Sequence, residues 1–436
     1  MAAGFLAKRM HTPTISRSRP APTLALAGTL VSLFAAAASA QAYTISIVAR
    51  NLMRPMGIVA AADGTLFITE VPEPGRSGGN NKVSRLDSAG RTVLVAGEPE
   101  PTHLARSTDG TLYWTCPSAG VIQRFANNTR TTLIAQLASP SGVAIGSGGT
   151  LYFTLVPTPG QGGMAGGRNT VNSWTLAGGV QTVTMGEPEP RDIAVDASGN
   201  LYWTCKSANV ILWRNAATGM VSPLLRGLDK PSGIAVDSSG AIYFTEVPTP
   251  GVNGRNGGRN RVTRYVPATQ TLTLINFGDP EPFDVAVLPD GNSVYWTCSS
   301  AGVIVRATRN RAPVTLSTMT SLGMGRPTPL LLRAPEFGNQ MYVAASSLGL
   351  GPILLGNENL ALAPDALLTV SIGGSAPSMF AGYAGRLDGA GAASAAILLP
   401  NLAELRGVAV MTGYVVLDAR APLGLIASDT LRLTVD

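Results

Sequence analysis

The sequence predicts an all-β protein, because one strand motif recurs six times and the repeat shows no helical periodicity. Each copy begins at a proline, has Gly, His or Asp two residues later, and ends in a strand with an aromatic residue and a threonine. The copies lie roughly 40 to 50 residues apart, which is the length of one four-stranded blade of a β-propeller. The repeat predicts a six-bladed propeller over residues 41–310. The six prolines are Pro55, Pro101, Pro140, Pro190, Pro231 and Pro282.

Two kinds of copy alternate along the chain. The copies that start at Pro55, Pro140 and Pro231 have Gly at the third position, and we call them first-type blades. The other three copies have His or Asp there and end in Trp-Thr-Cys, and we call them second-type blades. Within each copy, β-branched and aromatic runs are separated by Asp-Gly, Ser-Gly or Gly-Gly pairs, which predict strands joined by tight turns.

The N-terminal strand is expected to close the ring. Five outer strands lie between the copies, so the sixth blade lacks a fourth strand of its own. Residues 43–52 precede the first copy just as those outer strands precede theirs, and we predict that 43–50 pair beside 303–307. Such closure removes the open sheet edges that invite aggregation.

Two sequence patterns resemble known propeller families. The runs GIAVD and IYFTE within 231–246 are similar to NHL repeats and to streptogramin-lyase-like propellers, and LYWTC followed by GVIQR in 112–124 resembles the YWTD repeats of lipoprotein receptors. The likeness covers about 43–310 and implies a six-bladed propeller, a fold that hosts lactonases, lyases and binding modules. Where the YWTD pattern has Asp, this chain has Cys116, Cys205 and Cys298, so any hydrogen bonding by that Asp is absent here.

Residues 1–40 have the features of a secretory signal peptide. Basic residues and no acidic ones precede an Ala-rich apolar run at 23–40 that ends in small residues. The run is too short for a convincing membrane anchor, so we expect a secreted or periplasmic protein with no transmembrane segment after cleavage. Four of the 32 basic residues but none of the 26 acidic ones lie in this leader, so the remaining chain is nearly neutral. Without an aromatic-basic stripe, this charge balance excludes nucleic acid as the partner.

The three cysteines end the same strand in alternate blades. A ring would separate them by far more than the roughly 7 Å between Cα atoms that a disulfide tolerates. We expect three free, buried thiols. A trigonal thiolate metal site is the alternative, but these strand ends stand too far from the axis for three sulfurs to share one ion.

The repeat stops after residue 310. Residues 311–327 are rich in Thr, Ser, Gly and Pro and are predicted to form a linker. Residues 328–436 contain seven β-like runs, including ALLTVSI at 366–372, and predict a small β-sandwich that serves as a spacer or attachment module.

Charged residues are predicted to gather on the face of the ring where loops enter the innermost strands. In the second-type blades these loops hold Glu98 with Glu100, Glu187 with Glu189, and Asp279 with Glu281. Long Gly-rich loops follow Glu70 and Glu246 in first-type blades, and the loops of this type carry arginines. The alternative is that the Glu-Pro pairs are rigid turn residues. The predicted rim and loop binding residues are Glu70, Glu100, Glu189, Glu246, Glu281, Arg76, Arg168, Arg255 and Arg259.

The third position of the inner strand gives the sharpest candidate site. His103, Asp192 and Asp284 occupy it in the second-type blades, and the first-type blades have Gly there. One imidazole and two carboxylates near the axis are ligands for a divalent metal such as calcium. The alternative is that each Asp only hydrogen-bonds a neighbouring turn.

Two classes of function remain. The favoured one is a secreted, monomeric binding or scaffold protein that recognises a protein or glycan through its loop-rich face. The alternative is a divalent-metal-dependent lactone hydrolase or lyase with its site at the axis. His103 is the only histidine after the leader, so a Ser-His-Asp arrangement elsewhere is excluded.

Overall fold

The computed structural model describes residues 43–74, 79–158, 168–248, 259–309, 314–351, 353–355, 358–372, 376–417 and 425–436. About 55% of the chain is strand and 5% is helix, so the predicted all-β class is confirmed. Among the described residues, no helix is long and apolar enough to cross a membrane.

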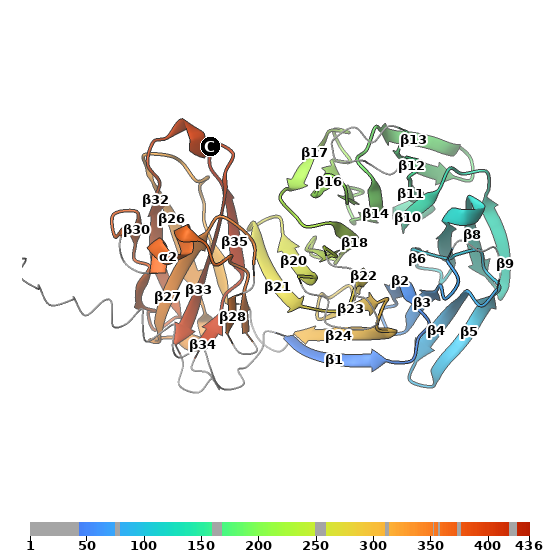
Figure 1. Ribbon diagram of the computed structural model, residues 1–436, viewed down its shortest axis with the longest axis horizontal. Helices are drawn as coiled ribbons and strands as arrows, with labels where there is room; N and C mark the ends of the chain where they lie inside the picture. The colour runs from blue at the N-terminus through green and yellow to red at the C-terminus, as the bar shows by residue number, and fades with distance from the viewer. Residues whose placement is uncertain are drawn as a thin grey trace, which may run out of the picture.

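Six groups of four paired strands stand around one axis (Figure 1), and we call them blades 1 to 6 in chain order. Five are separate four-stranded sheets, and blade 5 is part of a larger sheet. Blade 1 contains β2 (Pro55–Ala60), β3 (Leu66–Glu70), β4 (Lys82–Asp87) and β5 (Gly90–Ala96). Blade 2 contains β6 (Leu104–Arg106), β7 (Leu112–Cys116), β8 (Val121–Ala126) and β9 (Thr129–Ile134). Blade 3 contains β10 (Pro140–Ile145), β11 (Leu151–Leu155), β12 (Thr170–Thr175) and β13 (Gly179–Met185).

The second half of the ring has the same plan. Blade 4 contains β14 (Pro190–Val195), β15 (Leu201–Cys205), β16 (Val210–Arg214) and β17 (Val221–Leu225). Blade 5 contains β18 (Pro231–Val236), β19 (Ile242–Glu246), β20 (Arg261–Val266) and β21 (Thr271–Phe277). Blade 6 contains β22 (Pro282–Val287), β23 (Ser293–Cys298), β24 (Val303–Arg309) and the N-terminal strand β1 (Tyr43–Ala49). The first strand of each blade lies innermost in the ring.

Strand β1 closes the ring as predicted. It pairs antiparallel with β24, with Tyr43 opposite Arg309 and Ile45 opposite Ala307. Tyr43 is buried, and its hydroxyl accepts a hydrogen bond of 3.0 Å from Arg309 Nη2. The pairing covers the edge that β24 would otherwise expose.

The threonine of the second strand joins five of the six blades to the next. In blade 1, Thr69 Oγ1 accepts a hydrogen bond from Gly57 N at 2.8 Å and donates one to the carbonyl of Thr102 in blade 2 at 2.6 Å. Thr297 of blade 6 donates to the carbonyl of Met56 in blade 1 and so completes the circle. This role explains why threonine recurs in the repeat. The other three of these bonds run from Thr115 to the carbonyl of Ser141, from Thr204 to that of Ser232 and from Thr245 to that of Phe283.

Close backbone contact between blades explains the alternation of the third position. A Cβ atom on Gly142 would lie 2.6 Å from the Cα atom of Asp192, and one on Gly233 would lie 2.6 Å from that of Asp284. On Gly57 it would overlap the carbonyl oxygen of Thr102. First-type blades therefore need glycine where the next blade brings in His103, Asp192 or Asp284.

The C-terminal region forms two packed sheets over a common core. One sheet is β25 (Thr315–Ser317), β26 (Pro327–Arg333), β32 (Ala392–Leu398) and β30 (Phe380–Ala381). The other includes β31 (Ala384–Arg386), β27 (Met341–Ser347), β33 (Ala409–Leu417), β34 (Leu425–Ala427) and β35 (Thr430–Thr434). A hairpin of β28 (Ile353–Leu355) and β29 (Glu358–Leu360) and the helix α2 (Ala366–Ile372) flank them. Short 3-10 turns occur at 117–119, 147–149, 335–337 and 403–405.

Two predictions for this region are wrong. Part of the predicted linker 311–327 is strand β25, because Val314 and Leu316 are buried in the sandwich core. The run 366–372, predicted as a strand, is helix α2, whose first turn is capped by Asp365: its carboxylate accepts from Leu368 N at 3.0 Å.

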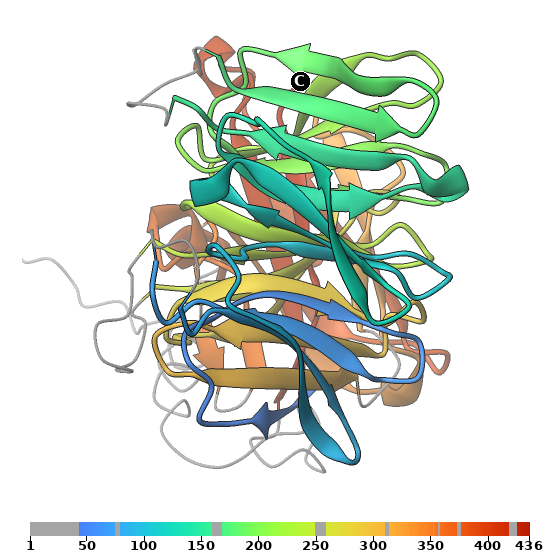
Figure 2. The same ribbon diagram turned by 90° about the vertical axis from the view of Figure 1, so that its right-hand side faces the viewer.

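The C-terminal region is joined to blade 5 by a shared sheet. Outer strand β21 pairs with β35, so the sheet of blade 5 continues into the C-terminal domain as one nine-stranded sheet. One hydrophobic cluster contains Phe244 and Leu272 from the propeller together with Leu362 and Met411. Figure 2 shows the outer strands of the blades facing the viewer and the C-terminal domain, in orange and red, behind them. The C-terminal domain is thus packed against one blade rather than tethered by a free spacer.

Candidate metal centre at the propeller axis

The innermost strands of blades 2, 4 and 6 bring three predicted residues together. His103 directly precedes β6, and Asp192 and Asp284 lie in β14 and β22. One potential ligand atom from each lies within 4.8 Å of the other two, and all three side chains are buried. We call this group the axis cluster.

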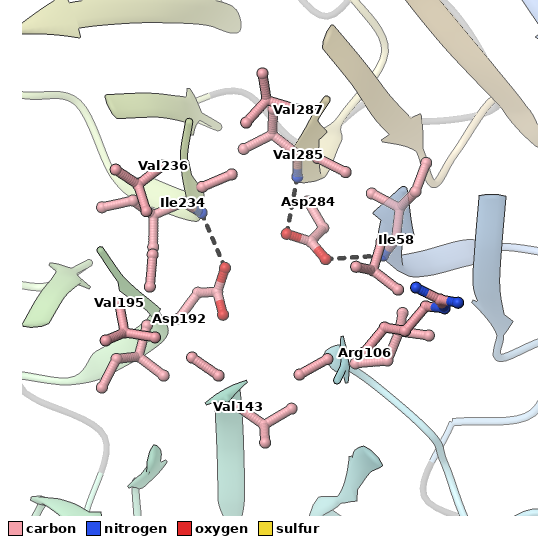
Figure 3. A pocket seen from close by; sticks show the side chains of 18 of the residues that line it. Ile58, Arg106, Val143, Asp192, Val195, Ile234, Val236, Asp284, Val285 and Val287 are labelled. Atoms are coloured by element: carbon pink, nitrogen blue, oxygen red, sulfur yellow. Dashed lines mark hydrogen bonds between the residues drawn. The ribbon is translucent and has the colours of Figure 1, made fainter. Parts of the chain in front are cut away.

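Each carboxylate in the axis cluster also links two blades. Asp192 Oδ2 accepts a hydrogen bond of 2.9 Å from Ile234 N in blade 5, and Asp284 Oδ2 accepts one of 2.9 Å from Ile58 N in blade 1 (Figure 3). Asp284 Oδ1 accepts a further bond of 2.8 Å from Val285 N. The hydrogen-bonding role that we weighed as the alternative is therefore present, and it orients both carboxylates.

The two carboxylates share a buried site and retain protons. Burial raises the pKa of Asp192 to about 7, although the backbone amide of Ile234 works in the opposite direction. Burial, and then the charge of Asp192, raise the pKa of Asp284 well above its ordinary value. Two carboxylates this close do not both ionise easily in a low-dielectric interior. Near neutral pH, the metal-free pair therefore holds at least one proton.

His103 is neutral and lacks hydrogen-bond partners. Burial lowers its pKa to about 3, with a smaller effect in the same direction from Arg191. The Ser141 backbone lies near enough to raise the pKa slightly, but neither ring nitrogen completes a hydrogen bond. Buried polar atoms are seldom left in this state, and a neutral imidazole is the form that binds metals. The donor set and the orphaned imidazole together fit a divalent cation.

Apolar side chains close the cluster on the side of the entering loops. Phe283 stacks on the His103 ring with centroids 5.3 Å apart and is 7% exposed. Met56 packs with Phe283 and is 6% exposed. The guanidinium carbon of Arg191 lies 4.8 Å from the centre of the Phe283 ring. Burial lowers the pKa of Arg191, and nearby Glu189 is the largest opposing influence.

On its other side the cluster faces a cavity along the axis. The cavity has a volume of about 190 Å³ and is lined by the innermost strands of all six blades. Asp192 and Asp284 are among its lining residues, and most of the others are Ile, Val and Ala (Figure 3). The open approach to the cluster is thus opposite to the face where sequence reasoning expected chemistry.

Three predicted rim residues do lie beside the entering loops. Glu100, Glu189 and Glu281 are partly exposed and adopt φ angles of 52°, 51° and 56°. Burial raises the pKa of Glu281, and Arg54 is the largest opposing influence. Their geometry leaves these carboxylates available at the surface.

The acidic residue two positions earlier in each loop has a structural role that sequence reasoning missed. Trp114 Nε1 donates to Glu98 at 2.9 Å, and Trp203 Nε1 donates to Glu187 at 2.9 Å. Trp296 does the same to Asp279 at 2.7 Å. The sequence signal was present, since an acid and a tryptophan recur 16 or 17 residues apart in every second-type blade.

Two rim predictions are wrong, because Glu70 and Glu246 are fully buried. Glu70 pairs with Arg91 at 2.7 Å, and Glu246 pairs with Arg261 at 2.6 Å. Burial raises the pKa of Glu246, and Arg261 opposes this. Both side chains end a second strand and point toward a basic residue in the same blade instead of toward solvent.

The predicted loop arginines are only partly described. Arg168 is exposed, and Arg259 forms an ion pair of 3.3 Å with Asp229. Arg76 and Arg255 lie outside the described residues.

The three cysteines are free and buried, as predicted. Burial and nearby carboxylates raise the pKa of Cys116, Cys205 and Cys298. Protonated thiols at these separate strand ends do not form a thiolate metal site.

No family model and no curated protein matches the sequence. The chain is similar to the solved structure of virginiamycin B lyase from Staphylococcus aureus, with 16% identity and a TM-score of 0.43 over 61% of this chain and 99% of that one. It is also similar to a gluconolactonase from Xanthomonas campestris, with 14% identity and a TM-score of 0.48 over 62% of this chain and 90% of that one. A third similar structure is regucalcin, a calcium-binding protein from Agrobacterium tumefaciens, with 15% identity and a TM-score of 0.48 over 63% of this chain and 97% of that one.

Proposed function

We propose that this chain is an exported six-bladed propeller with a C-terminal β-sandwich, and that a divalent cation binds in the axis cluster. The observation that carries the proposal is the convergence of His103, Asp192 and Asp284 with both imidazole nitrogens unpartnered. A cation there would satisfy the imidazole and offset the repulsion between the carboxylates. Export to a secreted or periplasmic location is supported by the basic and apolar leader.

The donor set indicates which ion fits. Imidazole suits zinc and other transition metals, whereas calcium takes six to eight oxygen ligands. One imidazole with two carboxylates therefore favours zinc or manganese over calcium.

The favoured role is that of a monomeric binding protein for a protein or glycan. The ion would fix three alternate blades, and the residues that precede the six prolines would present charges of both signs to the partner. All six have φ between 51° and 56°, a strained conformation for residues other than glycine that tends to occur at functional sites. These residues are Arg54, Glu100, Ser139, Glu189, Lys230 and Glu281.

A metal-dependent hydrolase or lyase acting on a lactone is the second candidate. It is favoured by one observation: Asp192 and Asp284 line the axial cavity, so one side of a bound ion would face a space for a substrate. There the ion would polarise a carbonyl group.

Elemental analysis of the purified protein, before and after treatment with a chelator, tests the cation site. Wild type should hold about one ion per chain and should melt at a higher temperature with zinc or manganese than without them. The variants His103→Ala and Asp192→Asn should bind no ion, and added metal should no longer raise their melting temperature. The control is Asp237→Asn, which removes a buried carboxylate bonded to Tyr243 outside the cluster and should leave the metal content unchanged. A wild-type protein that binds no ion contradicts the proposal.

The same variants separate the two roles. Loss of the ion should leave capture of a native partner nearly intact if the protein is a binding module, while replacing Glu100, Glu189 and Glu281 together by Gln should weaken it. Hydrolysis of a lactone panel that disappears with the ion would favour the enzyme.

A further inference from the structure

The axial cavity is the route by which a ligand can reach a cation in the axis cluster. Asp192 and Asp284 line the cavity, whereas His103 does not. His103 therefore lies on the side of the two carboxylates that Phe283 and Met56 close. An ion held between the three side chains would have its remaining coordination positions directed into the cavity.

The walls of this cavity are aliphatic. The side chains that surround the carboxylates in Figure 3 include Ile58, Val143, Ile234, Val236 and Val287. Such walls offer no hydrogen bonds from their side chains, so a fully polar ligand would lose its hydration without compensation.

One basic side chain lines the cavity. Arg106 occupies the inner-strand position that is Ala, Ile or Val in the other blades. Its guanidinium carbon lies 5.6 Å from the centre of the Phe67 ring, and its buried Nε has no hydrogen-bond partner. In Figure 3 its guanidinium points away from the two carboxylates, toward blade 1, so the charged side chains that face the cavity centre are Asp192 and Asp284.

We propose that the axial cavity binds a short aliphatic carboxylate. The carboxylate group coordinates the cation of the axis cluster, and the hydrocarbon chain packs against the aliphatic walls. With a volume of about 190 Å³ the cavity is small, so butanoate and hexanoate should fit it better than decanoate. The cation selects an anion over a neutral alcohol of the same length. This inference rests on the proposed cation site and names its ligand class.

Manganese-loaded protein provides the test, since a paramagnetic ion shortens the NMR relaxation times of protons that come near it. The probes are acetate, butanoate, hexanoate and decanoate, with hexanol as the neutral control. Affinity should rise about fourfold for each methylene group that enters the cavity, and should fall for decanoate. Protons next to the carboxylate should relax fastest, because that group is bound to the ion.

Two variants of opposite effect check that the cavity itself sets the chain length. Ala60→Leu places more side chain in the cavity and should shift the preferred acid from hexanoate toward butanoate. Val287→Ala enlarges the cavity and should shift the preference toward longer acids. Opposite shifts cannot arise from misfolding, which would weaken every acid. Ala217→Leu adds the same bulk at an exposed site and should keep the wild-type order.

The outcomes distinguish failure of the ligand proposal from failure of the proposed cation site. If manganese does not bind to wild type, the cation site and the ligand proposal both fail. If manganese binds but the protons of the acids do not relax faster, the ligand proposal alone is overturned. It is also overturned if hexanol binds as tightly as hexanoate. The same holds if affinity is independent of chain length.

Discussion

First-type and second-type blades have the same four strands and the same threonine hydrogen bonds, yet they stabilise themselves with different side chains. A second-type blade holds its entering loop through a tryptophan that donates to a buried acid, as Trp203 does to Glu187. In blade 5, a first-type blade, the corresponding residue is Phe244, and the buried acid is Glu246 at the strand end, paired with Arg261. The three second-type blades therefore share one set of stabilising side chains, and blade 5 uses another.

The difference at the inner strand matters most for function. Only three of the six inner strands can carry a large residue at the third position, because the neighbouring strand must have glycine there. The same packing that forces the alternation limits the third position to three polar side chains. A site built this way has a fixed number of protein ligands and leaves further coordination to other molecules.

The largest effect is expected from breaking the glycine side of this alternation. Gly142→Val would place a branched side chain against the backbone of Asp192, where even a Cβ lies 2.6 Å from the Cα atom. Neither backbone can move freely, so the free energy of unfolding should fall by about 3 kcal/mol or more. Urea denaturation measures this. Gly389→Ala, at a glycine with nothing within 4 Å, is the control and should change little; equal stability of both variants would refute the packing argument.

The next effect concerns pH and the carboxylate pair of the second-type blades. The folded pKa of Asp192 is raised from 3.8 to about 7, so the folded state binds more protons than the unfolded state between those values. Stability from this group is present at low pH and is lost as the pH rises through 7, by up to about 1.4 kcal/mol per pH unit. Chelator-treated wild type should therefore lose stability relative to Asp192→Asn between pH 5 and 7. Parallel stability curves for the two proteins would contradict the shared-proton pair.

A smaller effect should follow when the tryptophan pair is converted to the first-type residue. Trp203→Phe leaves one oxygen of buried Glu187 without its donor and should destabilise the protein by about 1 to 2 kcal/mol. Adding Glu187→Leu removes the unsatisfied acid, so the double variant should recover part of the loss. Thermal melts of the two single variants and the double variant measure the interaction energy between Trp203 and Glu187. Additive losses would show that the hydrogen bond does not matter.

The smallest effect is kinetic and involves the cysteines found only in second-type blades. Cys116, Cys205 and Cys298 should react slowly with a thiol reagent in the native protein and at once in denaturant, because all three are buried with raised pKa values. Stability should not change under reducing conditions. Rapid labelling of the native protein would mean that the second-strand ends are open.

The sequence predicts well what depends on position within the repeat. The strands, the closing role of Tyr43–Ala49 and the meeting of His103, Asp192 and Asp284 all follow from equivalent places in equivalent blades. The burial of Glu70 and Glu246 could not be predicted in this way, because it depends on which way a strand end faces and on Arg91 and Arg261 nearby.

Contacts between segments that are distant in the chain could not be predicted from the sequence either. The pairing of β21 with β35 joins residues far apart in sequence and has no counterpart in the other blades. Helix α2 depends on the cap from Asp365, which outweighs the β-like composition of the segment.

The closing strand has a consequence for the timing of folding. Tyr43 reaches its partner Arg309 across 266 residues of chain, so β1 is made long before the strand that pairs with it. At about 5 to 20 residues per second, β1 waits roughly 15 to 50 seconds during synthesis for its partner to emerge. Until then, the backbone groups of β1 are unpaired and the ring stays open. Closure of the ring is therefore a single long-range docking event, and contacts of such high sequence separation slow folding however stable the finished ring is.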